Sequence, residues 1–253
     1  MDSTPPAARY CTVQYTFPEN AGKWSTISAF EQRQDQQRTR GPPGPAAQCE
    51  EDGMAEKRSR GELRNGKLQK VAANLFLKHG YDGVSIDKIV EVAGGSKSTV
   101  YSEFGGKCGL FIRSIENLCR EANEPLGRLD YAGLNAEQSL KKLGFHILKF
   151  ITAPRSVELH RLAIAEAAHC PEVGEAWYEY GPKKTTAYLL EVLLRHRQEF
   201  RYTTIPMERV AVMLHDALIG DILSRRLAGV SKGESDVELR RKAKAVVDIV
   251  LAA

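Results

Sequence analysis

The chain has 253 residues, 42% of them apolar, and a formal net charge of +4. This length and apolar content allow one large domain or two small ones with a buried core. The mild excess of basic residues permits nucleic-acid binding but does not argue for it alone. No apolar run approaches the roughly 18–20 residues that cross a bilayer, and the first residues lack the apolar core of a secretory signal. The composition therefore argues against a membrane or exported protein.

Cysteine usage indicates a reducing compartment. The five cysteines are Cys11, Cys49, Cys108, Cys119 and Cys170. Their number is odd, no two form a C-x-x-C motif, and His169-Cys170 has no partner at zinc-ligand spacing. A cytoplasmic location, with no metal site and no cofactor, fits this pattern best.

Residues 1–53 differ in composition from the rest of the chain. They contain six of the eleven prolines and 5 Lys or Arg against 7 Asp or Glu, and they show no sustained period. We expect this segment to be disordered and dispensable for folding. Two interpretations remain open, namely a regulatory tail and a start codon assigned upstream of Met54.

From residue 62 onward the apolar residues recur with a helical period, which predicts an all-α fold. A first helix carries one apolar stripe and ends at Gly80. The stripe is Leu68, Val71, Ala72, Leu75 and Phe76. Later helices are expected at residues 107–123, 136–152, 155–169, 172–198, 206–227 and 235–252.

Two short helices are expected directly after the first. Ser85 is a good N-cap for the second helix, which Gly94-Gly95 ends. Ser96 can cap a third helix, in which Val100 and Phe104 face inward. Two such helices joined by a glycine turn have the shape of a helix-turn-helix, whose second helix enters the major groove of DNA.

The outward side chains of the third helix suit contact with DNA. They are Lys97, Ser98, Thr99, Tyr101 and Ser102. Hydroxyls reach phosphates and base edges, and the Thr99 methyl can contact a thymine methyl. A solvated surface helix would carry similar residues, so this alternative stays open.

Basic charge is concentrated ahead of the helix-turn-helix. Six basic residues, Arg64 among them, and one acid lie between Lys57 and Lys70, whereas three acids offset three lysines in residues 85–107. We expect this basic arm to neutralise phosphates and the third helix to contact bases. Lys107 and the amides that start the fourth helix predict a second phosphate contact.

The stretch Leu68–Phe111, LQKVAANLFLKHGYDGVSIDKIVEVAGGSKSTVYSEFGGKCGLF, resembles the DNA-binding domain of the TetR (tetracycline repressor) family. The matching pieces are Leu75-Phe76, Gly80-Tyr81, Ser85, Ile89, Ala93-Gly94, Ser96-Lys97, Thr99-Val100-Tyr101, Phe104 and Lys107. With the charge pattern, this makes the expected DNA-contacting residues Arg64, Ser85, Ser96, Lys97, Ser98, Thr99, Tyr101 and Lys107. Two departures are Gly95, which should loosen the turn, and Glu103, which stands where many members have a phosphate-contacting Tyr or His.

The segment Arg161–Lys184, RLAIAEAAHCPEVGEAWYEYGPKK, is similar to the ligand-binding domain of the AefR-like branch. This resemblance implies a helical, dimeric effector domain. The expected organisation is an extension at 1–53, a DNA-binding domain at 54–112 and an effector-binding and dimerisation domain at 113–253.

Enzyme motifs are weak, and no catalytic residue is expected. Gly105-Gly106-Lys107 resembles the end of a phosphate-binding loop, but Tyr101 and Cys108 replace its required glycine and Ser or Thr. Histidines and aromatic residues between 136 and 198 suit an apolar ligand pocket, or simply fill the core. The candidate ligand-binding residues are His146, Phe150, Glu166, His169, Trp177 and Tyr178.

Two apolar stripes near the end of the chain predict a homodimer. One stripe is Val210, Met213, Leu214, Ala217, Leu218 and Ile222, and the other is Ala243, Val246, Val247, Val250 and Leu251. The alternative is that both stripes face the core of a single chain. A two-fold dimer would place its reading helices about 34 Å apart on a near-palindromic double-stranded operator.

Together these patterns predict a ligand-responsive, DNA-binding transcriptional regulator, a repressor that a small apolar molecule releases from its operator. The alternative is a helical protein-binding or ligand-binding module without DNA function, in which the basic arm only adds solubility. Salt-sensitive binding to duplex DNA distinguishes the two.

Overall fold

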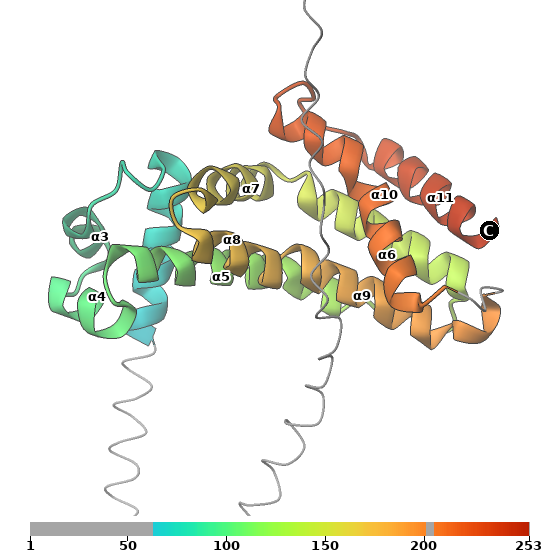
Figure 1. Ribbon diagram of the computed structural model, residues 1–253, viewed down its shortest axis with the longest axis horizontal. Helices are drawn as coiled ribbons and strands as arrows, with labels where there is room; N and C mark the ends of the chain where they lie inside the picture. Colours follow the sequence, from blue (N-terminus) through green and yellow to red (C-terminus); the bar gives the residue numbers. More distant parts are fainter. Residues whose placement is uncertain (1–62, 201–204, 253) are drawn as a thin grey trace, which may run out of the picture. The chain divides into compact units, whose positions relative to one another are not determined.

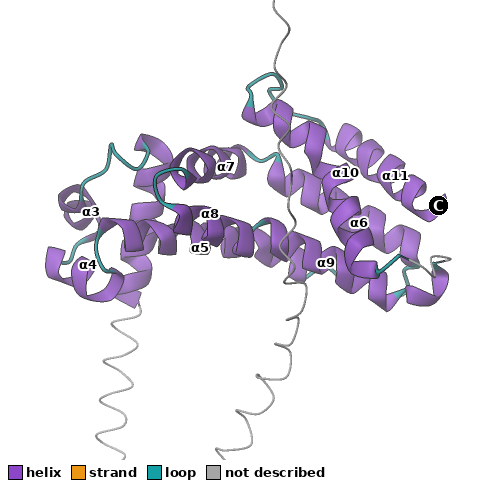
Figure 2. Ribbon diagram, in the orientation of Figure 1, coloured by secondary structure: helices purple, strands orange, loops and turns teal. Residues whose placement is uncertain are grey.

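The computed structural model describes residues 63–200 and 205–252, which lie in the compact unit Glu56–Ala253 (Figure 1). These residues form helices and no strand, which confirms the all-α prediction (Figure 2). A first helix covers residues 63–79. It is followed by α3 (Ile86–Ala93), α4 (Lys97–Phe104), α5 (Lys107–Gly127), α6 (Ala136–Ile151), α7 (Pro154–Ala167), α8 (Pro171–Tyr180), α9 (Pro182–Arg195), the 3-10 helix η2 (Arg197–Glu199), α10 (Met207–Leu227) and α11 (Asp236–Ala252). None of the helices in these ranges is long and apolar enough to cross a membrane.

The extension predicted at 1–53 lies outside the described residues, as do Lys57, Arg58 and Arg60 of the basic arm. The remaining basic residues of the arm, Arg64, Lys67 and Lys70, lie on the first described helix and are exposed.

The two short helices begin at the predicted serine caps. The Ser85 hydroxyl accepts the Lys88 amide at 3.1 Å, and the Ser96 hydroxyl accepts the Thr99 amide at 3.2 Å. Each bond satisfies an amide that the first turn of a helix leaves unpaired. Gly94 (φ +74°) ends α3 and Gly105 (φ +73°) ends α4, in a backbone region that favours glycine. The local chemistry of the helix-turn-helix is therefore as predicted.

Apolar side chains form two clusters. The amino-terminal cluster joins the first helix, α3 and α4 to α5, α7 and α8, and it includes Leu68, Phe76, Ile89, Val100, Phe111, Leu159 and Val173. The carboxyl-terminal cluster joins α6, α9, α10 and α11, and it includes Leu140, Ile147, Leu193, Leu218 and Val247. The core of the helix-turn-helix thus continues past residue 112 into α5, α7 and α8.

The segment 172–198, predicted as one helix, is two. α8 ends at Tyr180 and α9 begins at Pro182, with Gly181 between them. Proline has no amide hydrogen and cannot extend the hydrogen-bond ladder of the preceding helix. The Gly181 amide closes α8 by donating to the Trp177 carbonyl at 2.9 Å. The single helical stretch expected from the sequence left open whether Pro182 starts a helix or kinks one, and the structure shows a start.

Most residues of the two apolar stripes near the end of the chain pack in the chain's own core, whereas Met213 and Ala217 of the first stripe are exposed. A homodimer built on the last two helices stays a prediction. Leu214, Leu218 and Val247 have no exposed surface. They pack with α6, where a Cβ added to Gly144 would lie 3.3 Å from Leu218 and 3.4 Å from Ala243. Helical periodicity cannot tell whether an apolar stripe faces its own chain or a second copy.

Candidate nucleic-acid interface

The first turn of α4 presents a cluster of hydroxyl groups to solvent. The Ser96 hydroxyl, besides capping the helix, lies 2.8 Å from Ser98 Oγ and 3.0 Å from Thr99 Oγ1. Ser96 and Ser98 are exposed and Thr99 is half-buried, whereas Val100 is fully buried. The helix therefore turns polar donors and acceptors outward, where they suit phosphates and base edges.

Lys97, the first residue of α4, forms an ion pair across the turn. Its Nζ lies 2.6 Å from Asp87 Oδ1 of α3, and both side chains are mostly exposed. The hydrogen bond with the Asp87 carboxylate raises the pKa of Lys97, so the ammonium group stays charged at neutral pH. A DNA phosphate would compete with Asp87 for this cation.

Tyr101 projects from α4 and is 60% exposed. A Cβ added to Gly106 would lie 3.4 Å from Tyr101 Cε1, so the ring packs against the backbone of the turn that follows α4. Gly106 has a φ of +109°, which disfavours any other residue there. The glycine turn thus both ends the helix and supports the exposed ring.

The start of α5 has the features of an anion contact. Gly106 occupies its N-cap and supplies no side-chain acceptor, which leaves the first amides to solvent or an anion. The neighbouring Lys107 Nζ lies 4.1 Å from the centroid of the Tyr81 ring, a cation–π contact. Lys107 is the first residue of α5 and its ammonium group lies over the Tyr81 ring, and a phosphate contact there stays a prediction.

Arg64 and Ser85, the two remaining predicted contacts, are both exposed. Next to Arg64, the Asn65 side-chain amide donates to Glu103 Oε2 at 3.0 Å and so connects the first helix to α4. Sequence reasoning missed this contact, since residues 38 positions apart give no local signal. It also occupies the carboxylate of Glu103, for which no phosphate contact was expected.

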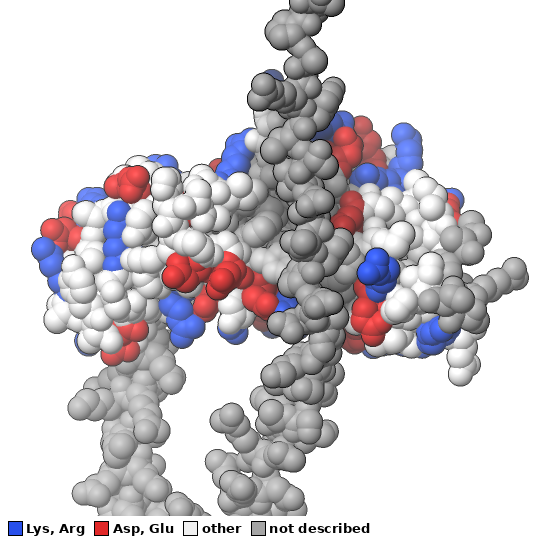
Figure 3. All heavy atoms as spheres, in the orientation of Figure 1, with Lys and Arg blue, Asp and Glu red and all other residues white. Residues whose placement is uncertain are grey.

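Charges over the helix-turn-helix are mixed. In Figure 3, basic and acidic side chains alternate at the end of the molecule that carries α3 and α4. Lys88 pairs with Glu91 at 3.0 Å, beside the Lys97–Asp87 pair. Phosphate attraction therefore has to come mainly from other residues, which is consistent with the role predicted for the basic arm.

The six candidate ligand-binding residues come from α6, α7, α8 and the turn between α7 and α8. His146 and Phe150 lie on α6, and Tyr178 on α8 is 56% exposed. The Trp177 ring packs edge-on against His160, with centroids 5.4 Å apart, so it belongs to the core of the chain. Glu166 and His169 do border a common pocket. Sequence order does not tell which helix faces converge, so a ligand-binding role for the six residues stays a prediction.

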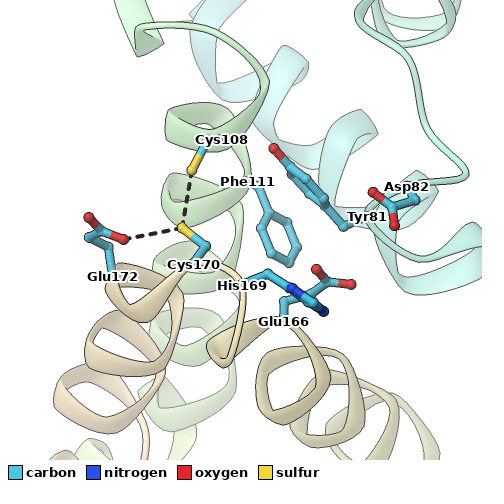
Figure 4. A pocket seen from close by; sticks show the side chains of 8 residues that line it. All are labelled: Tyr81, Asp82, Cys108, Phe111, Glu166, His169, Cys170 and Glu172. Atoms are coloured by element: carbon cyan, nitrogen blue, oxygen red, sulfur yellow. Dashed lines mark hydrogen bonds between the residues drawn. The ribbon is translucent and has the colours of Figure 1, made fainter.

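That pocket has a volume of about 520 Å³ and lies among the turn that follows the first helix, the start of α5 and the junction between α7 and α8 (Figure 4). Its lining residues are Tyr81, Asp82, Cys108, Phe111, Glu166, His169, Cys170 and Glu172. The Tyr81 and Phe111 rings lie 5.0 Å apart, and the burial of Tyr81 raises its pKa. Six of the eight were not predicted as ligand residues, because they come from segments that only tertiary packing brings together.

Two family models match the chain. Residues 68–113 match the model described as "Bacterial regulatory proteins, tetR family". Residues 138–253 match the model described as "AefR-like transcriptional repressor, C-terminal domain". Both resemblances inferred from the sequence are thereby confirmed.

Solved structures of regulators share this fold. A TetR-family transcriptional regulator from Mesorhizobium loti MAFF303099 is 26% identical, with a TM-score of 0.64 over 76% of this chain and 97% of its own. A transcriptional regulator from Pseudomonas aeruginosa PAO1 is 20% identical, with a TM-score of 0.64 over 76% of this chain and 92% of its own. The flavonoid-responsive regulator FrrA is 24% identical, with a TM-score of 0.62 over 76% of this chain and 96% of its own. The last two matches support a common fold.

Proposed function

Because the chain belongs to the TetR family of bacterial regulatory proteins and is a transcriptional regulator of that family, we propose that it is a repressor released from its operator by a small molecule. The observation that carries this proposal is the presentation of α4. Its capped first turn displays hydroxyls, and its exposed Tyr101 is supported by a glycine turn, while Val100 anchors the opposite face in the core. Base contacts would come from this surface, and phosphate contacts from Lys107, Arg64 and the rest of the basic arm.

A homodimer would present two such surfaces to a near-palindromic operator. The outward faces of α10 and α11 retain large exposed apolar side chains, one of which, Met213, belongs to the first predicted stripe. Met213 is 60% exposed, Val212 is 49% exposed and Ile249 is 71% exposed. The exposed Ala217 and Gly220 would let a second helix approach closely. We place the dimer interface on this face, which is opposite the buried Leu214 and Leu218.

The effector is proposed to act through the amino-terminal cluster. This cluster connects the helix-turn-helix to α7 and α8, so a ligand that displaces these helices also displaces α4. One structural relative is described as flavonoid-responsive, and flavonoids are mainly apolar molecules with a few polar groups. The pocket of Figure 4 carries the carboxylates of Asp82, Glu166 and Glu172, which disfavour an anionic ligand there. Neutral aromatic compounds are therefore the first effectors to test.

DNA binding is tested by selecting duplexes from genomic fragments with the full chain. We expect a near-palindromic preferred site whose affinity falls by roughly 1–3 kcal/mol in Tyr101→Ala, the cost of one base contact. Tyr178→Ala is the matched control, because Tyr178 is similarly exposed but lies on α8. If no duplex is preferred, the proposal fails and a binding module without DNA function is favoured. If a duplex is preferred but Tyr101→Ala binds like the wild type, the proposed reading by α4 fails.

Effector release is tested separately, with a panel of flavonoids, acyl compounds and aromatic acids. A true effector lowers operator affinity, and a tenfold effect requires about 1.4 kcal/mol of differential affinity between the two arrangements. Compounds that bind the protein but leave its operator affinity unchanged would remove the allosteric part of the proposal, whatever their affinity.

A further inference from the structure

Two cysteines from distant segments meet at the pocket of Figure 4. The Sγ atoms of Cys108 and Cys170 lie 3.1 Å apart and face each other, although the residues are 62 positions apart. Cys108 is the second residue of α5, which directly follows the helix-turn-helix, and Cys170 is the N-cap of α8. A bond between these sulfurs would join the DNA-binding end of the chain to the effector-binding helices.

The hydrogen bonds at this pair arrange the thiols for reaction. The Cys170 thiol donates to the Glu172 carboxylate at 3.3 Å. A thiol has one hydrogen, so with Cys170 donating to Glu172, Cys108 is the donor in the contact between the sulfurs. Burial, together with the bonds to Cys108 and Glu172, raises the pKa of Cys170 to about 12. Cys170 therefore keeps its proton at neutral pH, and we assign the attack on the peroxide to Cys108.

Both sulfurs are accessible to a small reagent. Cys108 and Cys170 are half-buried and line the pocket of about 520 Å³, which has room for a hydroperoxide. Cys119, on the same helix as Cys108, is buried in the amino-terminal cluster. Burial raises its pKa to about 12, which leaves little of the reactive thiolate. Cys108 and Cys170 are thus an accessible thiol pair, and the inaccessible Cys119 thiol serves as an internal reference for the rate of oxidation.

We propose that Cys108 and Cys170 are a modification site at which a hydroperoxide forms a disulfide, and that this disulfide changes the affinity of the regulator for its operator. The two sulfurs need to approach by only about 1 Å to reach the length of a disulfide bond. The site itself follows from the geometry alone. Its effect on DNA rests on the proposed function.

The reaction balances in two steps. The Cys108 thiolate attacks one peroxide oxygen, an S–O bond forms, the O–O bond breaks, and the alcohol or water that leaves takes up the proton Cys108 released. The sulfur of Cys108 is thereby oxidised to a sulfenic acid and the peroxide is reduced. The Cys170 sulfur then attacks that of Cys108, so the S–S bond forms and hydroxide leaves as water. The Cys170 thiol gives up its proton to the Glu172 carboxylate, and the departing hydroxide takes up one proton, so the products are the disulfide and one water.

The disulfide would affect DNA binding through α5. Two glycines separate the candidate reading helix α4 from Lys107, and Cys108 is the next residue. Fixing Cys108 to α8 holds the start of α5 in one arrangement. In a homodimer, the two α4 helices have to reach the spacing of the operator half-sites. With the start of α5 fixed, fewer arrangements of the α4 helices remain available for this fit.

The chemical test uses the full chain with Cys11→Ser and Cys49→Ser, which removes the thiols outside the described residues. The reduced protein is treated with hydrogen peroxide, alkylated in denaturant, digested and analysed by mass spectrometry. We expect a cross-linked peptide pair containing Cys108 and Cys170 that has lost two hydrogens, with Cys119 fully alkylated. The cross-link should form at least tenfold faster than in urea. The proposed site would be overturned if the Cys108 peptide were recovered without this cross-link, or if the cross-link formed equally fast in the folded protein and in urea.

Substitutions test the roles of the side chains. Cys108→Ser and Cys170→Ser should each abolish the cross-link, and sulfenic acid should then accumulate on Cys108 of Cys170→Ser. Glu172→Gln should slow the second step, whereas Glu175→Gln, which changes an exposed acid on the same helix, should not. Sulfenic acid appearing first on Cys170 would contradict the assignment of the attacking thiol.

The effect on DNA is measured with the operator recovered by selection. Oxidation of the parent chain should change the operator Kd by threefold or more, dithiothreitol should restore it, and Cys170→Ser should show no change. If the cross-linked protein has an unchanged operator Kd, the proposed regulatory role of the disulfide is wrong, but the modification site at Cys108 and Cys170 is still supported. If no operator is recovered, the proposed function fails, and the mass-spectrometric result still decides the site.

Discussion

Lys97 at the start of α4 and Asp87 in the first turn of α3 form an ion pair of 2.6 Å across the helix-turn-helix. The pair holds a cation on the helix proposed to contact DNA, but it also places a carboxylate beside the phosphates. The local geometry therefore sets the strength of a contact that the sequence alone assigned to Lys97.

We expect Asp87→Asn to strengthen binding to all duplexes and Lys97→Ala to weaken it. Removal of the carboxylate leaves the Lys97 cation fully available to a phosphate, which should steepen the plot of log K against log salt by about 0.9. Filter binding at several salt concentrations measures this slope. Glu91→Gln, which frees Lys88 within α3, is the control for general charge effects. An unchanged slope in Asp87→Asn would show that Lys97 contacts no phosphate.

Lys107→Ala should weaken binding to operator and random duplex by the same factor. The lysine lies beside the first amides of α5, where a phosphate would be bound irrespective of sequence, so its loss should reduce the salt slope by about one. Lys232→Ala, an exposed lysine before α11, should change neither quantity. A loss confined to the operator would instead make Lys107 a base contact.

Met213→Asp should dissociate the dimer while leaving each chain folded. Met213 is 60% exposed on α10, so a charge there meets solvent in the monomer but is desolvated at the proposed interface. Light scattering and thermal unfolding measure the two effects. The contrasting variant is Leu218→Ala, which should reduce the free energy of unfolding by about 2–5 kcal/mol because Leu218 is fully buried. A Met213→Asp protein that stays dimeric would exclude this face.

Acidification from about pH 7 to 5 should destabilise the fold. Burial lowers the pKa of His160 below its ordinary value of 6.5, and burial lowers that of His215 in the same way. In this window the unfolded chain gains protons that the folded chain does not, so the free energy of unfolding falls as the pH falls.

His160→Asn should reduce this pH dependence, because asparagine does not titrate and its amide can replace the ring Nδ1 that lies 2.6 Å from the Ser156 carbonyl. His79→Asn, a change at an exposed histidine, is the control. Denaturant unfolding at several pH values gives the measurement. A stability that is flat or rises on acidification would contradict the assignment.

The sequence by itself determined the helix-turn-helix, because its signals are local. Ser85 and Ser96 bond to amides three residues ahead, and the glycines that end α3 and α4 act on their own backbone. Each signal lies within one helical turn of its effect, so the order of residues is enough to locate it. Because these signals are local, the family resemblance could be recognised from the sequence over residues 68–111.

Only the tertiary structure decided which faces meet. An apolar stripe is equally suited to its own core and to a second chain, and packing against Gly144 of α6 assigned Leu218 to the core. The neighbours Trp177 and Tyr178 differ for the same reason, since Trp177 packs on His160 whereas Tyr178 is 56% exposed. Cys108 and Cys170 lie side by side although they are 62 positions apart, and no pattern in the sequence predicts this contact. Contacts between distant segments depend on the angles and offsets of whole helices, which no periodicity along the chain encodes.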